Sequence, residues 1–320
     1  MRAAAVQINS TDDYERNLRV AETLVRDAAA AGAEFVVLPE KWTTLGPPEA
    51  LVAAAEPLHG RALAAAGTWA RDLGIHLVAG SLPEKVEGRS KPFNTSVLIG
   101  PDGVRRAVYR KIHMFDVDIG DVSYRESETE DPGNEEVVSD VEGVPIGLTI
   151  CYDLRFPELY RVLALRGARV ITVPAAFTER TGRDHWEVLL RARAIENQLF
   201  IVAAGQVGEA PPHFRSYGRS MIIDPWGVVL AQAADTECFI AAELDFRVQD
   251  EMRSSVPALR NRRPDAYRWP QAKQPQGPPP PVTTDPQTVA EANGAGKNGA
   301  PTPGEDPVPE GSAPSQWVLP

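Results

Sequence analysis

Three residues with reactive side chains lie just after predicted strands: Glu40, Lys111 and Cys151. In α/β proteins, ligands bind near strand ends, where loops and helix N-termini converge. A carboxylate, an ammonium and a thiol that meet at one such edge would supply an acid–base group, a cation and a nucleophile. The placement of these three residue types therefore indicates an enzyme site built around a nucleophile.

Cys151 has the surroundings of a reactive thiol. An apolar strand precedes it, and Pro157, a residue type favoured at the first position of a helix, follows shortly after. Backbone N–H groups near a helix N-terminus lower the pKa of a thiol and bind an oxyanion, and we expect both effects at Cys151. An inert buried cysteine is the alternative for Cys151, and it is the favoured interpretation of Cys238, which lies inside a predicted strand.

Glu40 lies between a proline and a Lys-Trp pair, which predicts a desolvated carboxylate with a pKa raised toward that of a general base. A surface glutamate paired with Lys41 is the alternative. Lys111 is either a cation of the site or one of a solvated basic trio with Arg105 and Arg110. Taken singly these signals are weak, and the shared position after strands is what makes them specific.

A histidine is the other base that a cysteine nucleophile uses. His113, two residues after Lys111, is the best-placed candidate, and a loop histidine that holds backbone is its alternative. His113, Asp116 and Asp118 together resemble part of a metal site, but the sequence offers no second cluster to complete it. No dinucleotide, phosphate-loop or zinc-protease motif is present. We therefore expect neither a metal nor an organic cofactor.

The chain has 320 residues, of which 43% are hydrophobic and 24% charged, an ordinary globular composition. A net charge of −11 without a basic stripe disfavours nucleic acid and an anionic membrane surface as partners. Two cysteines exclude a disulfide framework. The apolar start ends at Asn9, too early for a signal peptide, and no apolar run is long enough to span a bilayer. A cytoplasmic location is expected.

The composition predicts a folded domain over residues 1–270 and a Pro-rich disordered tail over 271–320. The tail contains 12 prolines and one aromatic residue, so it cannot bury enough apolar surface to offset its ordering entropy. Within 1–270, strands alternate with helices, which predicts an α/β fold. The predicted helices lie near 18–28, 63–73, 157–166 and 185–198.

Strand–turn–strand patterns at 95–109 and 221–244 add antiparallel pairs. A mixed sheet is therefore more consistent with the sequence than a purely parallel one, and two layers of sheet covered by helices fit the length. Residues 113–143 have weak periodicity and many charges, so we predict a long loop there, of the kind that usually serves function.

Several segments resemble the nitrilase superfamily of carbon–nitrogen hydrolases, and within it the Nit-type ω-amidase and deaminated-glutathione amidase branch. They occur in the family's order over about residues 1–268, and Gly120 departs from the proline usual after the second of them. The main ones are Leu-Pro-Glu (38–40), Tyr-Arg-Lys-Ile-His-Met-Phe-Asp-Val-Asp-Ile (109–119), Cys-Tyr-Asp-Leu-Arg-Phe-Pro-Glu (151–158) and His-Trp-Glu (185–187).

This resemblance implies a four-layer αββα sandwich that commonly forms a homodimer. It implies catalytic roles for Glu40, Lys111 and Cys151, and for Glu126 as a second glutamate near the lysine. The implied reaction is cofactor-independent hydrolysis of a small carboxylate-bearing ω-amide through an acyl-thioester on the cysteine, with release of ammonia.

Three further residues are expected to bind substrate: Tyr152 through its backbone N–H, Arg155 through a substrate carboxylate, and Phe177 as part of the pocket wall. Arg180 and Arg183 are alternative carboxylate anchors, and an ion pair with Asp153 or Glu158 is the structural alternative for Arg155. An N-carbamoyl-amine or nitrile hydrolase of the same superfamily remains open as the activity. So does a Cys–His hydrolase, and so does a non-catalytic binding protein on this fold.

Overall fold

The computed structural model describes residues 1–120, 122–210 and 214–267. The chain divides into the units Met1–Arg263 and Pro264–Pro320, and only the short 3₁₀ helix η3 (Pro264–Ala266) of the described elements belongs to the second. The predicted tail over 271–320 lies outside the described residues and stays a prediction. Within the described ranges, no helix has the length and apolar character needed to cross a bilayer.

Two sheets form the centre of the first unit. The order in one sheet is β17 (Cys238–Glu243), β1 (Arg2–Gln7), β2 (Phe35–Val37), β3 (His76–Val78), β5 (Phe93–Ile99) and β4 (Leu82–Glu84), and β6 (Arg105–Arg110) also pairs with β5. The order in the other is β16 (Val229–Gln232), β15 (Met221–Ile223), β12 (Phe200–Gly205), β11 (Val170–Ala175), β10 (Val144–Leu148) and β9 (Val137–Val141). Two short hairpins are β7 (Asp116–Ile119) with β8 (Val122–Arg125), and β13 (Val207–Ala210) with β14 (Phe214–Tyr217).

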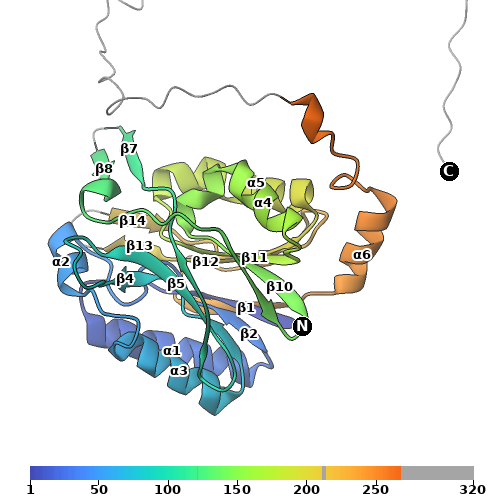
Figure 1. Ribbon diagram of the computed structural model, residues 1–320. Helices are drawn as coiled ribbons and strands as arrows, with labels where there is room; N and C mark the ends of the chain where they lie inside the picture. The colour runs from blue at the N-terminus through green and yellow to red at the C-terminus, as the bar shows by residue number, and fades with distance from the viewer. Residues whose placement is uncertain (121, 211–213, 268–320) are drawn as a thin grey trace, which may run out of the picture. The chain divides into compact units, whose positions relative to one another are not determined.

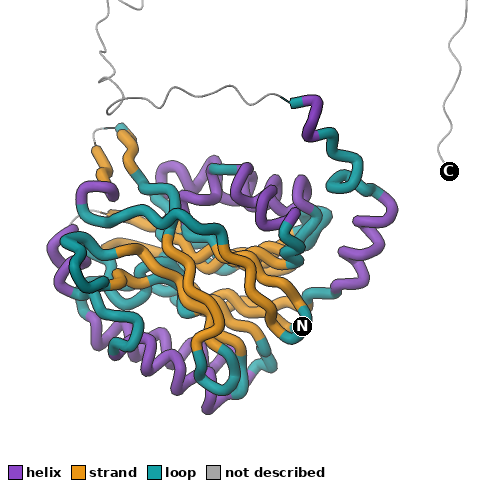
Figure 2. Tube along the Cα trace, in the orientation of Figure 1, coloured by secondary structure: helices purple, strands orange, loops and turns teal. Residues whose placement is uncertain are grey.

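Helices cover the outer face of each sheet, so the layers follow the order αββα (Figure 1). Helices α1 (Tyr14–Ala30) and α3 (Arg61–Leu73) lie against the β1 sheet, and α4 (Pro157–Leu165) and α5 (Glu179–Asn197) lie against the β12 sheet. The tube coloured by secondary structure shows the same four layers (Figure 2). The remaining helical elements are α2 (Pro48–Ala53), α6 (Phe246–Ser255) and the 3₁₀ helices η1 (Glu126–Glu128) and η2 (Cys151–Arg155). The expected α/β sandwich is confirmed.

Strand β1 shows how the layers are built, because successive side chains of a strand point to opposite faces of its sheet. Ala3 and Ala5 pack into the core between the two sheets, whereas Ala4 and Val6 pack into the core under α1 and α3. All four side chains are fully buried. The apolar run in this strand therefore reflects burial on both faces, as in parallel sheets covered by helices.

The expected mixture of parallel and antiparallel pairs is confirmed. Strands β5 and β6 are antiparallel, and so are β15 and β16, while β10, β11 and β12 run parallel. The strand predicted near 239–244 crosses to the other sheet and pairs with β1. Residues 113–143 are not a long loop: they contain the β7–β8 hairpin, η1 and β9.

The ends of the two sheets meet at one edge. Ile8, just after β1, forms a parallel bridge with Gln206, just after β12. The Gln206 side chain then donates a hydrogen bond of 2.9 Å to the backbone oxygen of Glu40, which follows β2. The residue that follows β2 thereby lies where β1 and β12 end.

Candidate active site

Glu40, Lys111 and Cys151 line one cavity of about 460 Å³. All three are buried, and they follow three different strands, β2, β6 and β10. The structure thus brings together the carboxylate, the ammonium and the thiol that the sequence singled out. It also places Glu126 in the same wall, from η1.

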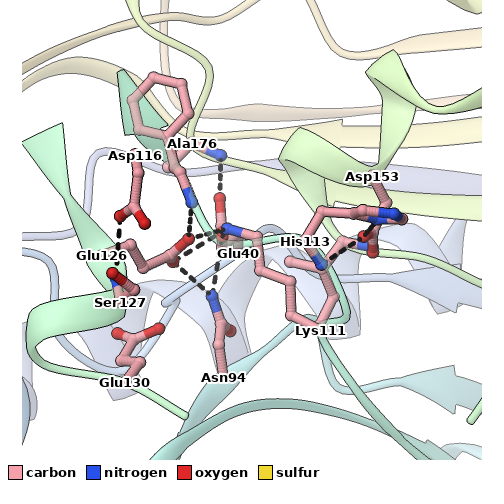
Figure 3. Close-up of polar contacts among 12 residues, drawn as sticks. Glu40, Asn94, Lys111, His113, Asp116, Glu126, Ser127, Glu130, Asp153 and Ala176 are labelled. Carbon is pink, nitrogen blue, oxygen red and sulfur yellow. Dashed lines mark hydrogen bonds and ion pairs between the residues drawn. The ribbon is translucent and has the colours of Figure 1, made fainter. Parts of the chain in front are cut away.

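Glu40 is held at both carboxylate oxygens (Figure 3). Its Oε1 accepts hydrogen bonds from Lys111 Nζ at 3.0 Å and from Asn94 Nδ2 at 2.8 Å. Its Oε2 accepts one from the backbone N–H of Ala176 at 2.8 Å. These three donors fix the position of the carboxylate. The alternative of a surface glutamate paired with Lys41 is wrong, because Lys41 pairs with other carboxylates.

Lys111 bridges two carboxylates. Its Nζ lies 3.0 Å from Glu40 Oε1 and 2.9 and 2.8 Å from the two oxygens of Glu126. Burial lowers the pKa of Lys111, but Glu126 and Glu40 outweigh burial and hold that pKa well above its ordinary value. The ammonium is therefore charged near neutral pH. The solvated basic trio is wrong, since Lys111 is buried and Arg110 pairs with Glu84.

Cys151 begins η2 in a strained conformation. Its φ is +45°, a value that residues other than glycine rarely adopt and that clusters at functional sites. Burial and the Glu40 carboxylate raise the pKa of the Cys151 thiol well above its ordinary value, against the opposing effect of Lys111. The expected lowering of this pKa is wrong, because burial and Glu40 outweigh the groups that lower it. The resting thiol is protonated and needs a base.

The turn that carries Cys151 is fixed by Asp153. The Asp153 carboxylate accepts hydrogen bonds from the backbone N–H of Ile150 at 2.9 Å and from the Tyr109 hydroxyl at 2.6 Å. His113 Nδ1 lies 2.7 Å from the same carboxylate (Figure 3). Its imidazole stacks on Phe156, with 3.6 Å between the ring centroids. His113 therefore supports the nucleophile turn, and it is not among the described residues that line the cavity.

The acidic residues near His113 are also occupied. Asp116 accepts a hydrogen bond from the backbone N–H of Ser127 at 3.0 Å, and Asp118 pairs with Arg125 at 2.7 Å. These contacts bind the two ends of the β7–β8 hairpin to each other. The two aspartates that the sequence grouped with His113 therefore stabilise the β7–β8 hairpin.

The predicted substrate-binding residues Tyr152, Arg155 and Phe177 all line the cavity. The Arg155 guanidinium lies over the Phe177 ring at 5.0 Å and contacts His185 Nδ1 at 3.2 Å. The ion pairs formed among the described residues include neither Asp153 nor Glu158 as its partner. Arg183 pairs with Glu179 on the outer helix instead.

Sequence reasoning missed four contributors to this site. Asn94 lies inside β5, Ala176 contributes only a backbone N–H, and Lys41 and Glu130 were not singled out as site residues. A detectable signal existed for Asn94, because a polar side chain inside an apolar strand needs a buried partner. The other contacts depend on tertiary packing and leave no local pattern.

Comparison with known proteins decides the family. Residues 2–253 match the family described as carbon-nitrogen hydrolase. This chain belongs to the carbon-nitrogen hydrolase family. It is 35% identical over 267 residues to omega-amidase NIT2 of Homo sapiens, which covers 83% of this chain and 96% of that protein. It is 41% identical over 271 residues to deaminated glutathione amidase of Bos taurus, which covers 82% of each.

The fold agrees with this family. The crystal structure of Saccharomyces cerevisiae Nit3, a member of branch 10 of the nitrilase superfamily, superposes with a TM-score of 0.74 at 31% identity and covers 80% of this chain and 94% of that one. The chain is accordingly a hydrolase that acts on carbon–nitrogen bonds other than peptide bonds, with a small-molecule amide as the class of substrate. The recognition made from the sequence motifs is confirmed.

Proposed function

We propose that this hydrolase removes ammonia from the terminal amide of small carboxylate-bearing ω-amides, through an acyl-thioester on Cys151. The observation that carries the proposal is the joint position of a buried thiol, the Glu40 carboxylate and the Lys111 ammonium in the wall of one cavity. A protonated thiol beside a carboxylate is the arrangement that base-activated nucleophilic catalysis requires.

The first half-reaction forms the thioester. Glu40 takes the proton of Cys151, and the thiolate adds to the amide carbonyl carbon. Lys111 and the backbone N–H of Tyr152 stabilise the oxyanion, and one such donor contributes roughly 3 kcal/mol. Glu40 then gives its proton to the amide nitrogen, the C–N bond breaks, and ammonia leaves. The acyl group remains on sulfur.

The second half-reaction restores the thiol. Glu40 takes a proton from a water molecule, whose oxygen adds to the thioester carbonyl carbon. The same oxyanion donors act again, the C–S bond breaks, and the proton held by Glu40 returns to the sulfur. Because Asn94, Lys111 and Ala176 hold both oxygens of Glu40, the carboxylate stays in place for all four proton transfers.

The carboxylate of the substrate has a suitable partner in Arg155. This guanidinium lines the cavity and lies over the Phe177 ring, which orients it without neutralising its charge. A guanidinium binds a carboxylate through paired charge-assisted hydrogen bonds. Relatives named omega-amidase and deaminated glutathione amidase are consistent with this substrate class.

Ammonia release from a panel of compounds tests the substrate class. We expect turnover of α-ketoglutaramate and none of an N-carbamoyl amine or an aliphatic nitrile. Replacing Arg155 by leucine is expected to raise KM for α-ketoglutaramate about 10- to 100-fold, in line with the loss of a charge-assisted contact. The same variant should leave turnover of an uncharged aliphatic amide within about twofold.

The matched control for this test is Arg183→Leu, which removes an arginine that pairs with Glu179 on α5 and does not line the cavity. It should leave both substrates unaffected. If Arg155→Leu lowered activity on charged and uncharged amides by the same factor, Arg155 would not bind the substrate carboxylate. Preferred turnover of the carbamoyl compound or the nitrile would replace the proposed activity by the corresponding alternative.

We also propose that two copies of this chain pair through the outer helices α4 and α5. Apolar side chains are exposed there: Val162 and Leu165 on α4, and Val188 and Ile195 on α5. Val188 is 66% exposed in the single chain. Apolar groups gathered on an outer face mark an interaction site, and a second copy is the commonest partner.

Light scattering coupled to size-exclusion chromatography tests the pairing. The wild-type chain is expected at twice its monomer mass, and Val188→Glu at the monomer mass, because a charge would be buried without a partner. Val104→Glu, in the turn between β5 and β6, is the control for a charge added at an exposed valine. A monomeric wild-type protein, or a Val188→Glu dimer, would contradict this assignment.

A further inference from the structure

Lys41 and Glu130 form a second buried ion pair next to the candidate catalytic residues. Lys41 Nζ lies 2.7 Å from Glu130 Oε1 and 3.3 Å from Glu126 Oε1. Glu126 in turn binds Lys111, which binds Glu40. The five side chains form one chain of alternating charge that ends at the base of the proposed mechanism.

We propose that Lys41 and Glu130 are positioning residues: they hold Glu126 against Lys111, and so hold Lys111 beside Glu40 and the reacting carbonyl. This inference rests on the proposed function, because it assigns a role within that mechanism. Neither residue needs to touch the substrate for this role. The family resemblance implied a catalytic role for Glu126. The structure adds the Lys41–Glu130 pair, whose lysine contacts Glu126.

The burial of Lys41 and Glu130 supports a role in the site. The side chains of Lys41, Glu126 and Glu130 are 11%, 8% and 1% exposed. Desolvation of buried charges is costly, and an apolar pair of similar volume is often at least as stable. A structural role alone is therefore a weak reason for charges at these two positions.

The backbone conformation of Lys41 also supports this role. Lys41 has a φ of +53°, a left-handed conformation that costs free energy in a residue other than glycine. Consecutive residues of an extended chain point in opposite directions. The left-handed turn at Lys41 instead lets Glu40 and Lys41 both line the same cavity. Ser81 Oγ stabilises this turn by accepting a hydrogen bond of 3.1 Å from the backbone N–H of Lys41.

The charge on Glu130 gives the pair a pH dependence. Burial raises the pKa of Glu130 to about 7, with Lys41 acting in the opposite direction and Glu126 adding to the rise. Lys111 is the remaining charged group acting on it, and it lowers this pKa. Above that pH, ionised Glu130 holds Lys41. Below it, neutral Glu130 no longer fixes the position of Lys41, so Glu126 loses one of the contacts that hold it against Lys111.

Steady-state kinetics of the full-length protein tests the role. Lys41→Met is expected to lower kcat about 10- to 100-fold with KM within about twofold, since small displacements of a catalytic group have effects of this size. In the wild type, kcat should rise as pH increases through about 7. Glu130→Gln keeps the shape of the side chain but cannot ionise, so its kcat should stay at the lower level and lack that step.

The double variant Lys41→Met with Glu130→Leu separates positioning from stability, because it removes both buried charges at once. We expect it to recover the melting temperature that Lys41→Met loses, without recovering kcat. Recovery of kcat together with the melting temperature would overturn the proposal, and so would a Glu130→Gln profile identical to the wild type. Lys85→Met, which removes an exposed lysine, is the control.

A readout without an amide substrate keeps this inference separable from the proposed function. The alkylation rate of Cys151 by iodoacetamide, measured by mass spectrometry across pH, reports the same network. We expect a step near pH 7 in the wild type, its absence in Glu130→Gln, and slower alkylation in Lys41→Met. Identical profiles in all three proteins would refute the positioning role, whereas failure to hydrolyse any ω-amide would refute only the proposed function.

Discussion

Replacing Cys151 by alanine is expected to lower kcat for amide hydrolysis by about 10⁴-fold or more, because the reaction loses its nucleophile and the covalent route with it. Glu40 and Lys111 would remain paired, and a direct attack by water is the path left. Ammonia release measured at high enzyme concentration checks this expectation. The melting temperature should change little, since the substitution removes one sulfur atom from the wall of an existing cavity.

Cys238→Ala is the matched control. This second free cysteine lies in β17 and is not among the described residues that line the cavity. Its replacement should leave kcat within about twofold. A Cys151→Ala variant that retained a tenth of wild-type turnover would rule out the thioester mechanism.

Glu40→Gln is expected to lower kcat by about 10³-fold, which combines the loss of general-base catalysis with a disturbed site. Glutamine cannot take the Cys151 proton, and burial keeps that thiol protonated near neutral pH. The amide group also faces the donors of Asn94 and Lys111 at the position of Oε1. The loss should appear in kcat, with KM nearly unchanged.

The comparison with His113→Ala separates the two possible bases. His113 binds Asp153 and supports the nucleophile turn, so its replacement should lower the melting temperature and reduce kcat about 10-fold at most. The Cys–His mechanism predicts the reverse order of effects. Full turnover in Glu40→Gln combined with inactive but folded His113→Ala would establish that mechanism instead.

The elements that the sequence predicted best are those with strong apolar periodicity. Helix α5 was expected from 185 and begins at Glu179, because its first turns lack large apolar residues and the apolar spacing starts only at Trp186. The β7–β8 hairpin was missed because each strand has only four residues and no buried side chain, so the alternation of Asp116–Ile119 is too short to mark a strand. Periodicity reports burial, and elements without burial leave no such signal.

The same distinction applies to the site. Glu40, Lys111 and Cys151 were detectable because strand ends converge in an α/β fold, whatever the exact packing. The direction of the Cys151 pKa was not, since it depends on how deeply the following turn is buried. Lys41 was considered only as a surface partner of Glu40, and its left-handed φ, which brings both side chains into one cavity wall, has no sequence signal.

Mass spectrometry of the enzyme, quenched in acid during turnover of an ω-amide, tests the central claim most directly. The acyl-thioester mechanism predicts a protein population heavier by the substrate mass less that of ammonia. After digestion, this added mass should lie on the peptide that contains Cys151, and it should be missing from Cys151→Ala. Steady ammonia release by an enzyme that never carries an acyl group on Cys151, together with undiminished turnover in Cys151→Ala, would contradict it.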